Sequence, residues 1–243
     1  MTIGLTEHQI EALDAYEELM KAHPALFVGR PARPIVRDRE ALARYASDHG
    51  VVLGLAADTP FALFINDLVE SRLAQGGAWR HPYLRVVARK QLEGGVNVVV
   101  LATIANASLG PPGAVVLVDQ ERHATGGRET ALPRGFGEPG LSGEANALRE
   151  LREETGYVGE RATLLGTTET DSGMTDARVS FYHVAVVDDG HATPETTESI
   201  AGARLATPSE LRQQILAGDI RDGFTLQAVG LYALHSGFWS NAG

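Results

Sequence analysis

The sequence contains no cysteine among its 243 residues, which excludes disulfide bonds, zinc–thiolate sites and thiol nucleophiles. It also lacks any run of about 18 apolar residues, so no membrane-spanning helix is expected. The N-terminus has no basic segment followed by an apolar run, which is the pattern of a secretory signal peptide. We therefore expect a cytoplasmic protein without a membrane partner.

Basic residues are few, because 21 Lys and Arg stand against 31 Asp and Glu, and the formal net charge is −10. Proteins that bind the nucleic-acid backbone usually present a basic face, so nucleic acid is not an expected partner. An acidic chain can still bind small phosphorylated ligands, since a bound cation reverses the local field. The apolar fraction of 44% is ordinary for a globular core.

The order of the predicted elements indicates an α+β fold with a mixed sheet. We predict a small α+β domain over residues 1–78 and a second domain over residues 79–243. Apart from the helix described next, helices are predicted over about residues 7–22, 38–47, 208–216 and 225–235. Strands are predicted over about residues 51–55, 61–65, 83–89, 96–104, 114–118, 128–133, 162–170, 179–187 and 198–205.

A further helix is predicted between Ser142 and Gly156, because Ser142 can cap its start and Gly156 can supply the left-handed residue that ends it. Within this helix Glu150, Glu153 and Glu154 stand at i, i+3 and i+4, so the three carboxylates share one face. Like charges at this spacing repel by about 0.2–0.5 kcal/mol per pair. A divalent cation such as Mg²⁺ or Mn²⁺ would remove the repulsion and can bridge carboxylates to a phosphorylated substrate.

The segment around this helix resembles the Nudix box, a pattern of Gly, five residues, Glu, seven residues and Arg-Glu-U-x-Glu-Glu-x-Gly-U, where U is apolar. Gly135 takes the first position, and residues 149–157 match the end of the pattern. Leu141 stands where the first Glu belongs, and Glu138 or Glu144 could compensate, although Glu144 lies on another helix face. A Glu-rich surface helix is the alternative, but the long gapped pattern favours the resemblance.

Three further segments are similar to the ADP-ribose and ADP-sugar pyrophosphatase branch of that family. They are Leu-Pro-Arg-Gly-Phe at residues 132–136, Asp-Ser-Gly-Met-Thr-Asp at 171–176 and Ile-Arg-Asp-Gly-Phe-Thr at 220–225. Ala177 follows the second segment, where the branch carries a Glu. The resemblance implies a Nudix-like α/β/α sandwich with a mixed sheet, and an N-terminal region that builds a homodimer or completes the substrate site.

The reaction implied is Mg²⁺- or Mn²⁺-dependent hydrolysis of the diphosphate bond in a nucleoside diphosphate linked to another moiety, such as ADP-ribose or an ADP-sugar. Glu150, Glu153 and Glu154 are the predicted catalytic and metal-binding residues. The resemblance adds the backbone carbonyl of Arg134 as a metal ligand. Arg149 is expected to pair with a carboxylate of the box.

Arg134 and Arg128 flank the start of the box helix and are predicted to meet phosphate, with solubilising surface charges as the alternative. Asp176 is predicted to bind substrate. Asp171, Asp176 and Glu169 are also candidates for a base that activates water, and turn formation is the alternative for each.

Leu141 and Ala177 leave a second function open, because both replace acidic positions of the pattern. The chain would then be a catalytically degenerate Nudix domain that binds a nucleotide ligand as a sensor or regulator. The retained carboxylates favour the enzyme, since adjacent like charges cost stability without a cation. Two other polar residues have structural interpretations, Asp222 as a helix cap and His183 as a core histidine.

Overall fold

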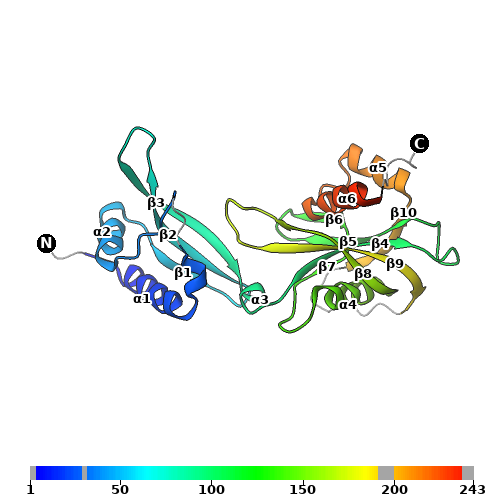
Figure 1. Cartoon of the computed structure of the whole chain (residues 1–243), viewed down its shortest axis with the longest axis horizontal. Coiled ribbons are helices and arrows are strands. Elements are labelled where there is room, and N and C mark those ends of the chain that lie inside the picture. The colour runs from blue at the N-terminus through cyan, green and yellow to red at the C-terminus, as the bar shows by residue number, and fades with distance from the viewer. Residues whose placement is uncertain (1–3, 29–31, 191–199, 237–243) are drawn as a thin grey trace. The chain divides into compact units, whose positions relative to one another are not determined.

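The computed structural model describes residues 4–28, 32–190 and 200–236 (Figure 1). The chain divides into two units, Met1–Leu92 with Asp171–Ala177, and Glu93–Thr170 with Arg178–Gly243. The division predicted at residues 78/79 falls at the start of a strand, and the first unit continues to Leu92. No helix in the described part of the chain is long and apolar enough to cross a membrane.

The first unit confirms a small α+β domain, in which two helices pack on an antiparallel sheet of order β1-β2-β3. Thr6 and Gln9 form a capping box at the start of the first helix, as the sequence indicates. The elements are α1 (Glu7–Ala22), the 3₁₀ helix η1 (Pro24–Phe27), α2 (Arg39–His49), β1 (Gly54–Asp58), β2 (Ala62–Arg72), β3 (Ala78–Ala88) and α3 (Arg89–Leu92).

A buried carboxylate lies in the core of this unit. Asp67 is 2% exposed, and it accepts hydrogen bonds from Tyr16 Oη and from Arg85 Nε, both at 2.5 Å. The Arg85 guanidinium also lies over the ring of Phe27, which packs edge-on against Tyr16. Burying an ionised group costs several kcal/mol unless partners compensate, and here Tyr16 of α1 and Arg85 of β3 are those partners.

Residues 171–177 join the first unit although the segments on both sides of them belong to the second. The Val86 N–H of β3 donates to the Met174 carbonyl at 2.8 Å. Tyr83 Oη donates to the Gly173 carbonyl at 2.6 Å. The loop expected to carry candidate bases is therefore held by backbone and side-chain bonds to strand β3.

The second unit is an α/β/α sandwich around a mixed sheet, as predicted. The main strand order is β10-β5-β4-β9-β8, with β6 beside β5 and β7 beside β4, and only β4 and β9 are parallel among these described pairs. The strands are β4 (Asn97–Ile104), β5 (Val115–Arg122), β6 (Gly127–Ala131), β7 (Arg134–Gly135), β8 (Tyr157–Glu169), β9 (Arg178–Asp189) and β10 (Ile200–Ala206), and the helices are α4 (Gly143–Thr155), α5 (Pro208–Ala217) and α6 (Gly223–Ser236).

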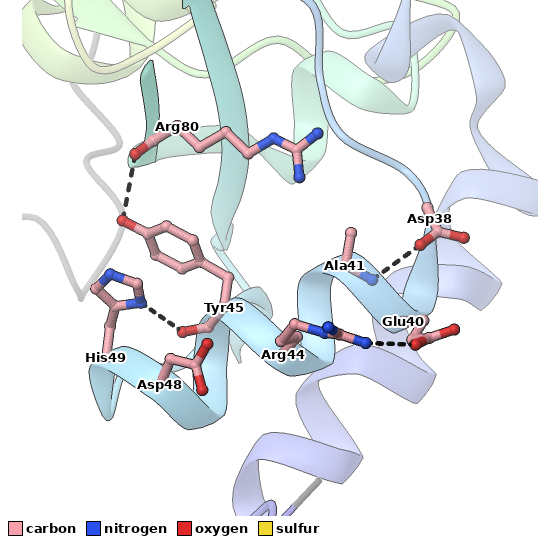
Figure 2. Close-up of a pocket in the computed structure, with 8 residues that line it drawn as sticks. All are labelled: Asp38, Glu40, Ala41, Arg44, Tyr45, Asp48, His49 and Arg80. Atoms are coloured by element: carbon pink, nitrogen blue, oxygen red, sulfur yellow. Dashed lines mark hydrogen bonds and ion pairs between the residues drawn. The ribbon is translucent and has the colours of Figure 1, made fainter. Parts of the chain in front are cut away.

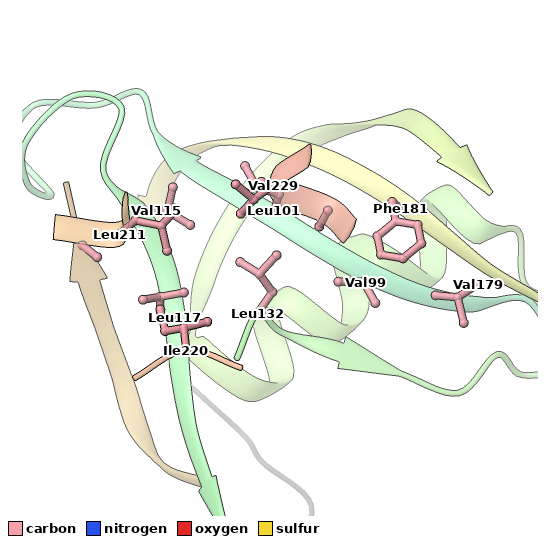
Figure 3. Packing of buried hydrophobic residues seen from close by; sticks show 12 residues of the cluster. Val99, Leu101, Val115, Leu117, Leu132, Val179, Phe181, Leu211, Ile220 and Val229 are labelled. Atoms are coloured by element: carbon pink, nitrogen blue, oxygen red, sulfur yellow. The ribbon is translucent and has the colours of Figure 1, made fainter. Parts of the chain in front are cut away.

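Helix α4 covers one face of this sheet, and α5 and α6 cover the other (Figure 1). Strand β4 is buried along its whole length because both of its faces are covered. Val99 and Leu101 point toward α6 in one core cluster, which Figure 3 shows, and Val98 and Val100 pack with α4 in the other. This packing fixes α4 against the sheet and leaves its opposite face for polar side chains.

Candidate active site

Helix α4 forms where its capping residues predict it. Ser142 Oγ accepts the Ala145 N–H at 3.2 Å, and Gly156 ends the helix with φ of 78°. Ala147 and Leu151 are fully buried against the sheet. The helical period then places the three predicted carboxylates around the remaining surface of α4.

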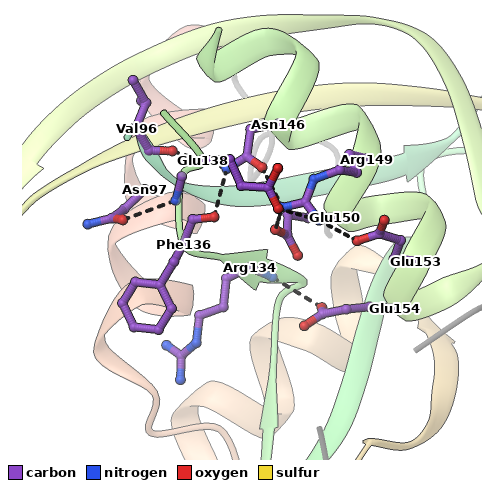
Figure 4. Close-up of polar contacts among 11 residues, drawn as sticks. Val96, Asn97, Arg134, Phe136, Glu138, Asn146, Arg149, Glu150, Glu153 and Glu154 are labelled. Carbon is purple, nitrogen blue, oxygen red and sulfur yellow. Dashed lines mark hydrogen bonds and ion pairs between the residues drawn. The ribbon is translucent and has the colours of Figure 1, made fainter. Parts of the chain in front are cut away.

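One guanidinium holds two of these carboxylates (Figure 4). Arg149 Nη2 lies 2.5 Å from Glu150 Oε1, and its Nη1 lies 2.6 Å from Glu153 Oε2. The expected pairing of Arg149 with the box is therefore confirmed. Glu150 is 5% exposed, whereas Glu153 is half-buried. The positive charge offsets the repulsion between the two carboxylates.

The third carboxylate reaches the segment before the box. Glu154 is 3% exposed, and its Oε2 accepts the backbone N–H of Arg134 at 3.1 Å. The neighbouring Gly135 lies directly against Glu150, because a Cβ built at Gly135 would clash with the carboxylate carbon and both oxygens. Close approach of a buried side chain therefore explains why the pattern needs glycine at this position.

The Arg134 side chain points away from Glu154 (Figure 4). Its Nη1 lies 2.7 Å from Asp222 Oδ1, and its guanidinium lies 4.6 Å from the centre of the Phe224 ring. Asp222 Oδ2 in turn accepts the Thr225 N–H at 2.9 Å, which confirms its predicted role as a helix cap. No sequence signal connected Arg134 with Asp222.

Two asparagines that sequence reasoning missed support the Gly-rich loop. Asn146 is fully buried and donates to the carbonyls of Val96 and Phe136, while its Oδ1 accepts from Arg149 Nη2 at 2.9 Å. Asn97 Oδ1 accepts the Gly137 N–H at 3.3 Å. The spacing of Asn146 three residues before Arg149 was the available signal, since residues at i and i+3 are neighbours on a helix.

The position of the missing box glutamate is held by the half-buried Leu141. Glu138 Oε1 lies 3.9 Å from Arg149 Nη1, so Glu138 approaches the guanidinium that holds the box carboxylates. Glu144 is exposed and lies near Tyr182, whose pKa is raised by burial and then by that negative charge. Of the two compensating acids considered, Glu138 is thus the one that contacts the box.

The other predicted site residues have partners elsewhere. Arg128 is exposed on β6, where its Nη2 lies 3.2 Å from Asp119 Oδ2. Asp176 belongs to the first unit, and its carbonyl accepts from Gln91 Nε2 at 3.1 Å. Asp171 Oδ1 accepts the Gly173 N–H at 3.0 Å, which is the turn-forming role given as its alternative.

His183 is a half-buried histidine of β9, as predicted. Its Nε2 lies 2.9 Å from Thr103 Oγ1, and its ring stacks on Tyr232 of α6 with centroids 4.7 Å apart. Burial lowers the pKa of this imidazole below its usual 6.5. These contacts give His183 a packing role between the sheet and α6.

Two hollows adjoin α2 and α4. The one on α4 has a volume of about 650 Å³ and is edged by the charged side chains Arg149, Arg152 and Glu153. The one on α2 has a volume of about 460 Å³, and its charged groups pair locally, for example Arg44 with Glu40 (Figure 2). Only the hollow on α4 adjoins residues predicted for the site.

The donor chemistry of the box fits Mg²⁺ or Mn²⁺, because carboxylate and carbonyl oxygens are the ligands that such hard cations take. The clash at Gly135 shows that the Glu150 carboxylate is seated against the chain just after the proposed carbonyl ligand. In the described part of the chain, no three His, Asp or Glu side chains are grouped to hold a metal. Two of the carboxylates are instead turned to Arg149.

Comparison with known proteins places these features in a family context. A NUDIX domain family model matches residues 96–226. An ADP-sugar pyrophosphatase from Mus musculus is 40% identical over 83 residues, which cover 33% of this chain and 38% of that protein. An ADP-ribose pyrophosphatase from Saccharomyces cerevisiae is 33% identical over 93 residues, which cover 38% of this chain and 40% of that protein. The matched stretch thus spans about two fifths of each relative.

A solved structure titled as the crystal structure of an ADP compounds hydrolase aligns with a TM-score of 0.58 at 15% identity. The alignment covers 77% of this chain and 92% of that chain. At this identity the likeness concerns the fold alone.

Proposed function

The chain belongs to the NUDIX family and is distantly homologous to ADP-sugar and ADP-ribose pyrophosphatases, and from this premise we propose that it hydrolyses the diphosphate bond of a nucleoside diphosphate linked to another moiety, of the ADP-ribose or ADP-sugar type. The observation that carries the proposal is the pair of buried carboxylates, Glu150 and Glu154, on the face of α4 beside the Gly-rich loop. Buried acids are rare without a compensating function or partner.

The proposed metal ligands are Glu150, Glu153, Glu154 and the backbone carbonyl of Arg134. When bound, Mg²⁺ or Mn²⁺ would offset the phosphate charges and lower the pKa of a water molecule. Arg149 keeps Glu150 and Glu153 together on one side of the helix. The Arg134 N–H keeps Glu154 beside the loop that follows.

In the proposed hydrolysis, the water oxygen bonds to one phosphorus, and the bridging oxygen leaves with the other phosphate group. Glu150 is our candidate to accept the proton of the water. It lies beside the Gly-rich loop, and it is the most buried of the acids that contact Arg149. The products are two phosphate monoesters, one of which is a nucleoside monophosphate.

The test is a hydrolysis screen with Mg²⁺ or Mn²⁺ in which alkaline phosphatase releases inorganic phosphate from any monoester formed. The substrates are ADP-ribose, ADP-glucose, GDP-mannose, NADH and dinucleoside polyphosphates, and nucleoside triphosphates are tested without alkaline phosphatase by chromatography of the nucleotide products. Metal-dependent turnover that the Glu150→Gln variant loses would support the proposal and identify the substrate. Absence of turnover on every substrate would contradict it.

The second candidate is a nucleotide-binding module without turnover. It is favoured by the Arg149 contacts, because two box carboxylates are already paired with one guanidinium and no metal-binding group of acids is formed in the described chain. Leu141 and Ala177 at two acidic positions of the pattern point the same way. Calorimetry with ADP-ribose would separate the candidates, since the module would bind the ligand and leave it intact.

The homodimer, and the contacts of Arg128, Arg134 and Asp176 with substrate, stay predictions. Light scattering of the purified chain tests the dimer. An increase in KM in the Arg128→Met or Asp176→Asn variant, with kcat retained, would support a substrate contact.

A further inference from the structure

The backbone and the side chain of Arg134 contact two different parts of the second unit. Its N–H donates to Glu154 on α4, and its guanidinium pairs with Asp222, 88 residues further along the chain. The two paired side chains are only 19% and 12% exposed. An ion pair so shielded from water is screened little by salt, and loss of one partner leaves a poorly solvated charge.

The start of α6 fixes the other end of this connection. Asp222 Oδ2 accepts hydrogen bonds from the N–H and the hydroxyl of Thr225, at 2.9 and 2.8 Å. Thr225 Oγ1 accepts the Leu132 N–H at 3.0 Å. The cap of α6 therefore binds the residues on both sides of Pro133, just before the box begins. With this pairing, the charge of Arg134 is already matched within the fold.

We infer that Asp222 and Arg134 are positioning residues, which form a tether from α6 through the Arg134 backbone to the Glu154 carboxylate. The inference rests on the proposed function, because the position of Glu154 matters for the metal that the reaction needs. Arg134 acts in this arrangement through the place of its backbone, and this inference is the alternative to the phosphate contact predicted for its guanidinium. Outer-shell partners of this kind orient the groups that bind a metal.

The test compares Arg134→Met, Asp222→Asn and the double variant with the unchanged chain. Asp222→Asn retains an oxygen that can cap α6, and thermal melting followed by circular dichroism checks folding. Arg221→Met is the matched control, because Arg221 is 72% exposed in the same segment and its contact with Glu129 does not touch the box. Mn²⁺ affinity is measured by electron paramagnetic resonance, and KM for substrate is measured at saturating metal.

Each single variant should bind Mn²⁺ about tenfold more weakly or worse, as measured for outer-shell partners, while KM at saturating metal is unchanged. The double variant should be no worse than the weaker single one, because both changes break the same tether. Arg221→Met should bind Mn²⁺ like the unchanged chain. Arg134→Lys, which retains a charge near Asp222, should recover part of the affinity and serves if Arg134→Met is unstable.

Unchanged Mn²⁺ affinity in both single variants would overturn the tether, as would a raised KM at saturating metal in Arg134→Met, which would reveal a phosphate contact. Failure of the proposed function looks different. The unchanged chain would then bind Mn²⁺ and show no turnover, and the comparison of Mn²⁺ affinities would still decide the tether. An unchanged chain without Mn²⁺ affinity would overturn both.

Discussion

Substitution of Gly135 by alanine would place a methyl group in the space that the Glu150 carboxylate fills. A Cβ at Gly135 would lie closer than 3.0 Å to Cδ and to both oxygens of Glu150, whereas ordinary contact begins at 3.4 Å. The carboxylate must therefore move by roughly 1 Å or more, and misplacement by about 1 Å can reduce turnover about 100-fold. We expect a loss of that size for Gly135→Ala.

The displaced carboxylate would also lose its 2.5 Å contact with Arg149, so the metal concentration for half-maximal activity should rise. The assay is turnover of the substrate found in the screen across a Mg²⁺ titration, with Mn²⁺ binding as a readout independent of chemistry. Gly230→Ala is the control, because a Cβ at Gly230 in α6 meets nothing within 4 Å. That control should retain activity, and helix propensity predicts a gain of about 1 kcal/mol in the free energy of unfolding.

Wild-type turnover and metal dependence in Gly135→Ala would refute the assignment of Glu150 to the reaction. If the variant loses only its folding, the melting curve will show this. Mn²⁺ binding and turnover would then both fall in proportion to the folded fraction. A folded variant that binds Mn²⁺ more weakly and turns over slowly is the expected result.

Three further predictions concern stability and its pH dependence. Asn146→Ala removes the amide that binds the Val96 and Phe136 carbonyls, so urea unfolding should show a loss of about 1–3 kcal/mol. Tyr16→Phe removes a hydrogen bond to the buried Asp67 carboxylate, and a loss of about 1.5–3 kcal/mol is expected in the same assay. His183 has a folded-state pKa below the unfolded 6.5, so its contribution is fully present above pH 6.5 and is lost as the pH falls below it, because the unfolded chain then binds more protons. Unfolding free energies measured from pH 7.5 to 5.5 should therefore fall less steeply for His183→Gln, and parallel curves would contradict this.

The box helix could be predicted because its signals are local. The caps Ser142 and Gly156, and the spacing of Glu150 and Glu154, depend on residues within one helix, and all appear as expected. Hydrophobic periodicity gave the approximate strands and helices in the same way, and the order of these elements then predicted the mixed sheet.

Other features depend on contacts between distant residues and left no local trace. The pairing of Arg134 with Asp222 joins β7 to the start of α6, and composition around either residue is typical of a turn or a cap. The boundary was predicted too early, at 78/79, because the first half of β3 does not have the sequence of a typical strand. It contains charged and aromatic residues and Pro82. An edge strand such as β3 tolerates proline, because a position without a ladder hydrogen bond needs no N–H.

The place of residues 171–177 in the first unit was not predicted either. Backbone hydrogen bonds such as that from Val86 to Met174 require no particular side chains, so the sequence carries no signal for them. The sequence pattern indicates that this loop carries candidate bases, but it gives no information about which unit holds them.

The formal charges of the candidate site bear on the proposed binding of a divalent metal. Glu150, Glu153 and Glu154 share a helix with Arg149, and that guanidinium offsets one of their three formal negative charges. The Arg134 guanidinium adds nothing to this balance, since Asp222 already neutralises it. Two formal negative charges therefore remain on the helix, and Glu138, 3.9 Å from Arg149, adds a third. Because Glu150 and Glu154 are buried, this negative charge is poorly screened by water, and the proposed divalent cation would be attracted more strongly here than at an exposed acidic helix.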